Sequence, residues 1–361
     1  MKIAIVHDYL NEAGGAERVL RVLADMYPTA PIYTAFIKNG TARAMFTDRE
    51  LHESSWGWIL KRGRLYSYLR FLLPWIWGSI DLSSYDLVIT STSGGYIARG
   101  FKVGEKTRVV AYCHTPPKWL YGYETPTGAA NKWWGRLFNY VFGPPLRYFD
   151  YISAQRVNTW IANSQEVALR IKKFYRREVR VVYPPIEIKS GVAMEKDKKG
   201  DYFLLVTRVT GAKGIVEALN AARMGSFKLK LVGELIEKRL ENSINQAGKN
   251  VEYLGRVSDG ELSKLYANAR GFIALARDED FGMTVVEAMG YGTPILALKS
   301  GGYKETVVEG ITGHFVEDVA VESILLGIKK MSETKWEKSR IINRAREFDR
   351  SKFEEKIREI I

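Results

Sequence analysis

A chain of 361 residues is too long for one ordinary hydrophobic core, and 46% apolar with 26% charged residues excludes a disordered chain. A single cysteine, Cys113, excludes an intramolecular disulfide and fits a reducing compartment. The formal charge of +13 lies mostly in residues 1–185, which hold 25 Lys and Arg residues against 14 Asp and Glu residues. Such a basic half predicts a polyanionic partner: a membrane surface, a nucleic acid or a phosphorylated substrate.

The first half of the chain alternates short apolar runs with helical patterns. Residues 16–26 and 165–175 have the apolar spacing of helices. This alternation predicts a largely parallel sheet with helices on both faces. The chain enters its first apolar run without the pattern of a signal peptide, so we expect a cytoplasmic location. The runs predicted to be strands are 2–6, 31–36, 86–90, 108–113, 159–162 and 179–183.

Polar residues and glycines follow several of these strands. Gly14 and Gly15 lie between the first strand and the next helix, where two glycines let a backbone approach a phosphate closely. They do not form the Gly-x-Gly-x-x-Gly dinucleotide fingerprint, which argues against NAD binding. His114 follows the strand 108–113 and lies at a carboxyl strand end, where ligands bind in such folds. A structural histidine with satisfied hydrogen bonds is the alternative.

Residues 56–77 form a basic segment rich in tryptophan. An amphipathic, cationic and Trp-rich sequence is typical of a segment that lies in the membrane interface. Its most apolar run, 71–77, is too short to span a bilayer and contains Pro74. A buried helix pair and a protein-binding groove are the alternatives. Nucleic-acid binding is disfavoured, because zinc spacing, aromatic RNA-binding motifs and long Lys/Arg runs are missing. The side chains expected on the membrane and acceptor side are Trp58, Arg62, Arg64, Arg70, Trp75 and Trp77.

A polar, lysine-rich stretch at 189–201 predicts a linker between two domains. A second alternating series follows, so the chain is predicted to form two doubly wound α/β domains, 1–185 and 186–334. The charged tail 335–361 has helical spacing and is expected to cap the second domain or to cross back to the first. The strands predicted in the second series are 202–207, 228–232, 251–254, 272–276 and 294–298.

Charged residues gather at two strand ends of the second domain. Arg208 and Lys213 lie at a strand-to-helix turn, where two cations suit a diphosphate. Glu279 and Glu287 lie eight positions apart across a second such turn, and the start of its helix is an anion site. A nucleotide-sugar, with phosphate in its middle and hydroxyls at both ends, suits a pocket of this kind. Solvated carboxylates, favoured near a helix start by the macrodipole, are the alternative.

These motifs resemble those of the family-four retaining glycosyltransferases, which have the GT-B fold. The resemblance rests on the Glu-x7-Glu element 279–287, on Thr207-Arg208 with Lys213-Gly214, and on Tyr112-Cys113-His114-Thr115-Pro116. It extends over nearly the whole chain, and the Cys-His-Thr-Pro form looks most like the mannosyltransferase branch that builds lipopolysaccharide O-antigen. Asp280, where glycine is frequent in the family, and the missing Pro-Glu before Lys213 are departures that leave the donor open.

The resemblance implies two Rossmann-like domains that face a central cleft, and a role for each matching residue. Arg208 and Lys213 would neutralise the donor diphosphate, and Glu287 would accept hydrogen bonds from the ribose. Glu279 would orient the donor sugar, with a covalent intermediate on Glu279 as the alternative. The catalytic residues that the resemblance implies are Glu279, His114, Arg208 and Lys213. The donor-binding residues that it implies are Gly14, Gly15, Arg208, Lys213, Phe281, Gly282, Met283, Thr284 and Glu287.

The resemblance further implies a retaining, metal-independent hexosyltransferase. Mannose from GDP-mannose would pass to a lipid-linked glycan at the cytoplasmic face of the membrane, with the basic first domain on the anionic surface and the tail 335–361 packed on that domain. No cofactor, metal or nucleic acid is expected, and the four histidines and one cysteine lack metal-ligand spacing. A UDP-sugar donor, a nucleotide-sugar hydrolase or epimerase, and a non-catalytic binding protein are the alternatives. The linkage and the oligomeric state stay open.

Overall fold

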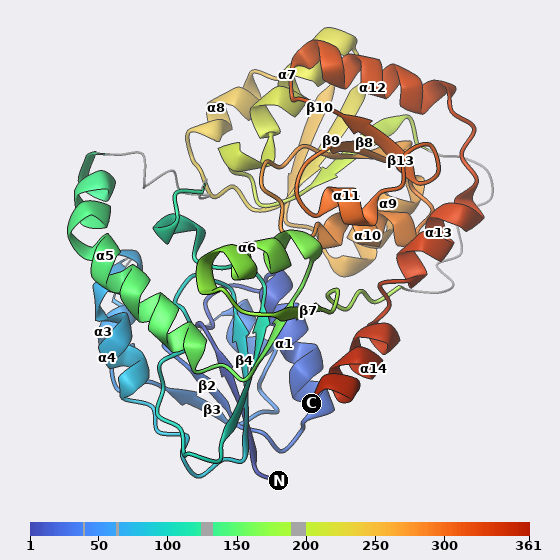
Figure 1. Ribbon diagram of the computed structural model, residues 1–361. Coiled ribbons are helices and arrows are strands. Elements are labelled where there is room, and N and C mark those ends of the chain that lie inside the picture. Colours follow the sequence, from blue (N-terminus) through green and yellow to red (C-terminus); the bar gives the residue numbers. More distant parts are fainter. Residues whose placement is uncertain (39, 63–64, 124–132, 189–199) are drawn as a thin grey trace. The chain divides into compact units, whose positions relative to one another are not determined.

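The computed structural model describes residues 1–38, 40–62, 65–123, 133–188 and 200–361. Their contacts divide them into two compact units (Figure 1). Unit 1 comprises the described part of residues 1–185 together with Phe353–Ile361, and unit 2 comprises the described part of Ile186–Lys352.

Unit 1 is built on a seven-stranded parallel sheet with the strand order β3-β2-β1-β4-β5-β6-β7. Because parallel neighbours need crossover connections, helical segments separate most of its strands in the sequence. Its elements are β1 (Ile3–His7), α1 (Gly15–Met26), β2 (Ile32–Thr34), α2 (Thr41–Ala44), β3 (Leu51–Glu53), α3 (Gly57–Leu60), the 3-10 helix η1 (Leu65–Leu72), α4 (Leu73–Gly78), β4 (Leu87–Thr92), β5 (Arg108–Cys113), η2 (Lys118–Leu120), α5 (Trp133–Gln155), β6 (Thr159–Ala162), α6 (Gln165–Tyr175) and β7 (Val179–Val181).

Successive residues of the central strands enter two separate cores. Val88 and Ala111 pack into one cluster, whereas Ile89 and Val110 pack into the other. This division follows from the period of two along a strand, which points alternate side chains to opposite faces of the sheet. All six residues of β4 are buried, as a parallel strand with both faces covered requires.

Unit 2 holds a six-stranded parallel sheet with the order β10-β9-β8-β11-β12-β13. Its elements are β8 (Tyr202–Val206), η4 (Gly211–Lys213), α7 (Ile215–Gly225), β9 (Lys228–Val232), α8 (Leu240–Asn245), β10 (Val251–Gly255), α9 (Asp259–Asn268), β11 (Gly271–Ala274), α10 (Met283–Gly290), β12 (Ile295–Leu298), α11 (Tyr303–Thr306), β13 (Gly313–Val316), α12 (Val321–Glu333) and α13 (Lys338–Arg346). The prediction of two parallel α/β sheets is confirmed.

The charged tail consists of two helices that belong to different units. Helix α13 packs on α10, and Arg344 donates a hydrogen bond to the carbonyl of Thr306, 3.3 Å away, so this part of the tail belongs to unit 2. Most of α14 (Arg350–Ile360) belongs to unit 1. There Phe353 packs edge-on against the ring of Tyr112 at 5.5 Å. Only residues 353–361 of the predicted tail therefore group with the first unit.

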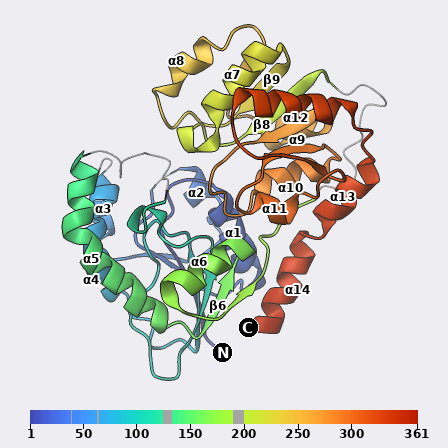
Figure 2. The same cartoon turned by 45° about the horizontal axis from the view of Figure 1, so that its top comes forward.

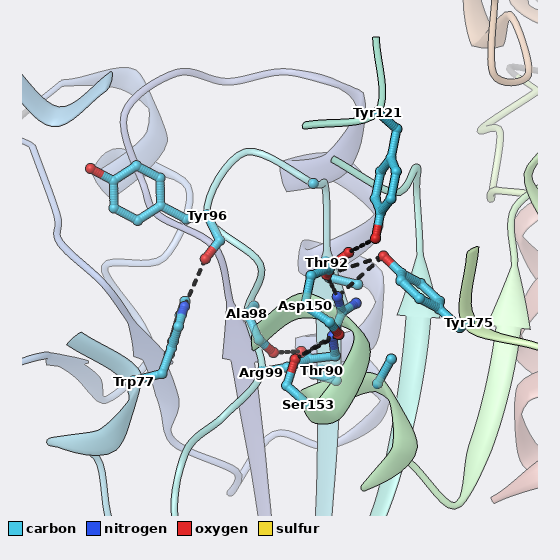
Figure 3. A network of polar contacts seen from close by, with 12 residues as sticks. Trp77, Thr90, Thr92, Tyr96, Ala98, Arg99, Tyr121, Asp150, Ser153 and Tyr175 are labelled. Atoms are coloured by element: carbon cyan, nitrogen blue, oxygen red, sulfur yellow. Dashed lines mark hydrogen bonds and ion pairs between the residues drawn. The ribbon is translucent and has the colours of Figure 1, made fainter. Parts of the chain in front are cut away.

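A buried ion pair in unit 1 joins helix α5 to the segment that follows β4 (Figure 3). The guanidinium of Arg99 donates a hydrogen bond to the Asp150 carboxylate of α5, and both side chains are almost fully buried. Tyr121 donates to the second Asp150 oxygen at 2.8 Å, and Tyr175 donates to the first at 3.2 Å. Burial raises the pKa of Asp150, while the Arg99 charge opposes that shift. These contacts supply the partners that a buried charge needs.

Candidate functional site

The candidate donor site of unit 2 lies where β8, β11 and β12 end. These three strands are neighbours in a parallel sheet, so their carboxyl ends meet at one edge. Three loops follow them, 207–214, 275–282 and 299–302, and each leads toward a helical segment. Arg208, Lys213 and Glu279 therefore belong to neighbouring loops, whereas Glu287 lies on the helix α10 that follows the second loop.

Close backbone packing fixes the loop that carries Glu279. The Arg277 N–H donates to the Ala212 carbonyl at 3.2 Å on one side, and the Gly302 N–H donates to the Glu279 carbonyl at 2.9 Å on the other. Gly301 has a φ of +52°, and a Cβ atom at this position would lie 2.2 Å from the backbone carbonyl oxygen of Glu279. Only glycine therefore permits this approach.

Lys213, Glu279 and Tyr303 meet in this edge of unit 2. Lys213 Nζ donates to Glu279 Oε2 at 2.7 Å, and the Tyr303 hydroxyl lies 3.5 Å from the same oxygen. The Lys213 and Glu279 side chains are 24% and 18% exposed, so water reaches them only in part. Burial, and then the nearby Glu279 charge, raises the pKa of Tyr303, which keeps its hydroxyl protonated as a donor. A cation and a carboxylate are thus held side by side in a partly dry position.

The other residues predicted to bind the donor in unit 2 differ in their position and burial. Gly282 precedes α10 with a φ of +88°, and Met283 and Thr284 form the first turn of that helix. Phe281 is buried and packs on Phe348, with 5.4 Å between the ring centroids. Arg208 is exposed at the end of β8.

Glu287 lies in the second turn of α10. Its Oε2 accepts a hydrogen bond from the Tyr266 hydroxyl at 2.9 Å. The Tyr266 ring in turn stacks on Tyr291 with 5.7 Å between the ring centroids. Glu287 is therefore an oriented carboxylate, which argues against a freely solvated side chain.

The candidate site of unit 1 is a chain of polar groups at the ends of β1, β4 and β5. His7 Nδ1 lies 3.1 Å from Ser91 Oγ, and Ser91 Oγ lies 2.9 Å from His114 Nε2. The other ring nitrogen of His7 is 3.6 Å from Glu17 Oε1. Glu17 Oε2 accepts from the Gly14 N–H at 2.9 Å, so this carboxylate already occupies the turn expected to approach a phosphate. Gly15 is the first residue of α1.

Burial, followed by the proximity of His7, lowers the pKa of His114 from 6.5 to about 3. At neutral pH the ring is therefore uncharged. His114 therefore brings no positive charge to this end of the sheet.

The depressed pKa of His114 makes unit 1 sensitive to acid. The stability that a neutral His114 contributes is complete above pH 6.5 and is lost between pH 6.5 and 3, because only the unfolded chain takes up this proton. The expected loss is about 1.4 kcal/mol per pH unit within this window. His114→Asn should remove it, as measured by urea unfolding at pH 7 and pH 5, with His52→Asn as the control. Equal acid sensitivity of the wild type and His114→Asn would contradict this prediction.

The residues expected on the membrane side do not share one environment. Trp58 and Trp75 are each 59% exposed, whereas Trp77 is fully buried and donates to the Tyr96 carbonyl at 2.7 Å. The membrane-side assignment of Trp77 is therefore wrong. In the short helix α4, residues two positions apart point to opposite sides, so burial of Trp77 leaves Trp75 outside.

The arginines of the segment 56–77 also contact different side chains. Arg62 lies over the Trp58 ring at 4.9 Å, and Arg70 lies over the Trp119 ring at 4.7 Å. Arg64 lies outside the described residues.

No described helix combines the length and the hydropathy needed to cross a bilayer. The residues that the structure describes also contain no group of three or more His, Cys, Asp or Glu side chains able to hold a metal ion.

Comparison with known proteins places this fold in a family. The Anabaena protein HepE, solved in complex with UDP and glucose, matches with a TM-score of 0.72 at 20% identity, covering 100% of this chain and 99% of HepE. Glycosyltransferase Family 4 matches residues 13–190, and Glycosyl transferases group 1 matches residues 190–348. The chain belongs to the GT-B glycosyltransferases.

Two curated relatives of this GT-B glycosyltransferase show how far sequence similarity reaches. An uncharacterized glycosyltransferase of Methanocaldococcus jannaschii is 27% identical over 176 residues, which cover 47% of this chain and 48% of that protein. This alignment thus spans about half of the relative's length. The GDP-Man:Man(3)GlcNAc(2)-PP-Dol alpha-1,2-mannosyltransferase of Mus musculus is 27% identical over 383 residues, covering 87% of this chain and 76% of that protein.

Sequence reasoning missed three groups that the structure of this GT-B glycosyltransferase brings to the candidate sites. Ser91 links the two histidines, Tyr303 reaches Glu279, and Tyr266 orients Glu287. Ser91 and Tyr303 were open to inference, since Ser91 lies near a strand end and Tyr303 follows Gly301-Gly302. Tyr266 lies inside a helix, 21 positions from Glu287, and no local pattern marks it.

Proposed function

We propose that this GT-B glycosyltransferase moves a hexose, with retention of its anomeric configuration, from a nucleotide-sugar to a lipid-linked glycan. The observation that carries the proposal is the meeting of Lys213, Glu279 and Tyr303 at the carboxyl edge of the unit 2 sheet. Ligands of doubly wound folds bind at this edge. A cation next to an orienting carboxylate suits a diphosphate joined to a sugar.

The charges of the reaction assign a role to each group. When the bond from the anomeric carbon to the diphosphate breaks, negative charge develops on the leaving oxygen. Arg208, Lys213 and the N-terminus of α10 would stabilise that charge. Lys213 would exchange its bond to Glu279 for one to phosphate, and Glu279 would then face the sugar. The acceptor hydroxyl would attack the anomeric carbon from the face of the sugar that the diphosphate leaves. Its proton would pass to the departing phosphate oxygen.

We propose GDP-mannose as the donor and a glycan on a lipid diphosphate at the inner face of the cytoplasmic membrane as the acceptor. The name of the mouse mannosyltransferase contains GDP-mannose and a glycan on dolichyl diphosphate, which supports both choices. The basic half of the chain agrees with a polyanionic acceptor. A UDP-sugar is the second candidate donor, because the structurally similar HepE was solved with UDP and glucose.

The test is a panel of GDP-, UDP- and dTDP-sugars. GDP-mannose should raise the melting temperature most, and labelled mannose should enter a lipid-extractable product with its anomeric configuration retained. The transfer should persist in EDTA, since the cations Arg208 and Lys213 are proposed to replace a metal. Arg208→Ala should weaken both effects, with Arg223→Ala on α7 as the matched control. A panel in which no sugar nucleotide stabilises the protein would refute the proposal. A response to UDP-sugars alone would make a UDP-sugar the donor in place of GDP-mannose.

A further inference from the structure

Exposed large apolar side chains are concentrated in one part of unit 1. Of the 15 such side chains among the described residues, nine lie on α5 or in the segment 57–78, so their distribution is far from even. Six of the nine belong to α5, where the sequence predicted no element. The α5 residues are Trp133, Leu137, Tyr140, Val141, Tyr148 and Ile152, and the others are Trp58, Tyr68 and Trp75.

The six apolar side chains of α5 form a single helix face. At 3.6 residues per turn, their positions fall within about 120° of the helix circumference. The opposite side of α5 enters the core, where Leu146, Asp150 and Ala154 are buried. The exposed face is therefore an apolar stripe without a cover among the described residues of unit 1.

The charge on this face has one sign. Arg136 and Arg147 are exposed on α5 and lie along one margin of the stripe by helical spacing. The sole carboxylate of α5, Asp150, is buried against Arg99. The chain between Glu53 and Asp81 contains no acidic residue at all. Among the described residues of α5 and of the stretch 54–80, the exposed charged groups are therefore all cationic.

Helices α3 and α4 lie alongside α5 in both views of the molecule (Figures 1 and 2). Phe71 of η1 stacks on Phe142 of α5 at 5.0 Å, which joins the two segments. The exposed Trp58 and Trp75 thus belong to the two helices that flank α5.

We infer that this surface, the exposed face of α5 with Trp58 and Trp75, docks unit 1 on an anionic lipid bilayer. Tyrosine and tryptophan suit the headgroup region, because an apolar ring and a polar tip are both satisfied there. The arginines would meet anionic headgroups, which favours a membrane over an uncharged protein surface. The inference shares the membrane partner of the proposed function but depends on no donor or reaction.

The test uses the full chain and vesicles of phosphatidylcholine with and without phosphatidylglycerol. The wild type should co-sediment with the anionic vesicles, and less so at high salt. Tyr140→Ser/Tyr148→Ser should lower the partition coefficient about tenfold or more. Arg136→Ser/Arg147→Ser should bring binding to the level of neutral vesicles. The matched control is Leu169→Ser/Leu326→Ser, which removes two side chains that are 64% and 68% exposed elsewhere.

The inference is overturned if Tyr140→Ser/Tyr148→Ser binds anionic vesicles like the wild type, or if the wild type binds neither kind. It is also overturned if the double tyrosine variant changes only the sedimentation coefficient of the free protein, since the face would then join copies of the chain. Stabilisation by nucleotide-sugars is measured without vesicles. Failure of the donor panel therefore leaves the docking surface standing, and failure of the vesicle test leaves the donor site standing.

Discussion

Replacing Lys213 with alanine is expected to lower kcat by about 10²–10³-fold, because one fixed cation beside the developing charge on the diphosphate is lost. In the structure Lys213 Nζ is 2.7 Å from Glu279 Oε2, so the ammonium is already positioned. The measurement is steady-state transfer with the donor that the panel selects. Lys228→Ala is the matched control, since Lys228 forms an equally short ion pair with Asp201 on the exposed surface.

A structural role for Lys213 would give a different result. If Lys213 served only to hold Glu279, then Lys213→Ala and Glu279→Gln would impair transfer alike, and neither would change affinity for a nucleoside diphosphate without sugar. The proposed role requires Lys213→Ala to weaken that affinity while Glu279→Gln leaves it unchanged. Equal affinities in the three proteins would remove Lys213 from the diphosphate site.

Replacing Arg99 with methionine is expected to destabilise unit 1 by about 3–5 kcal/mol, because it leaves the Asp150 charge buried without its partner. Both side chains are almost fully buried (Figure 3). The rings of Trp160 and Tyr175 lie 5.1 Å and 4.9 Å from the guanidinium. Urea unfolding of purified Arg99→Met measures the loss.

The paired variant Arg99→Met/Asp150→Asn tests the cause. Removing both charges should restore a large part of the stability, because no unpaired charge stays buried and the amide oxygen still accepts from Tyr121 or Tyr175. A double variant no more stable than Arg99→Met would mean that packing around Arg99, and not the unpaired carboxylate, causes the loss. Since Asp150 lies on the buried side of α5, Arg99→Met should also loosen the proposed docking surface and weaken vesicle binding.

Much of the fold could be predicted from local patterns. The strand 108–113 and the helix 165–175 have the bounds expected from the sequence, because the strand is a short apolar run buried on both faces and the helix buries residues with helical spacing. Helix α5 escaped prediction. Its Gly143-Pro144-Pro145 run normally ends a helix, yet both prolines lie on the exposed side of a continuous one.

The sequence by itself determined two parallel α/β domains, a basic first half, and the charged residues that follow neighbouring strands. These features depend on residue order and periodicity, which a chain carries before it folds. The tertiary structure decided which of them meet. It paired Lys213 with Glu279, gave Glu287 the Tyr266 hydroxyl, and joined His7 to His114 through Ser91. It also buried Trp77 and left Trp75 exposed. The physical reason is common to these cases: contacts between distant residues, and the face that a helix turns to the core, depend on packing between elements.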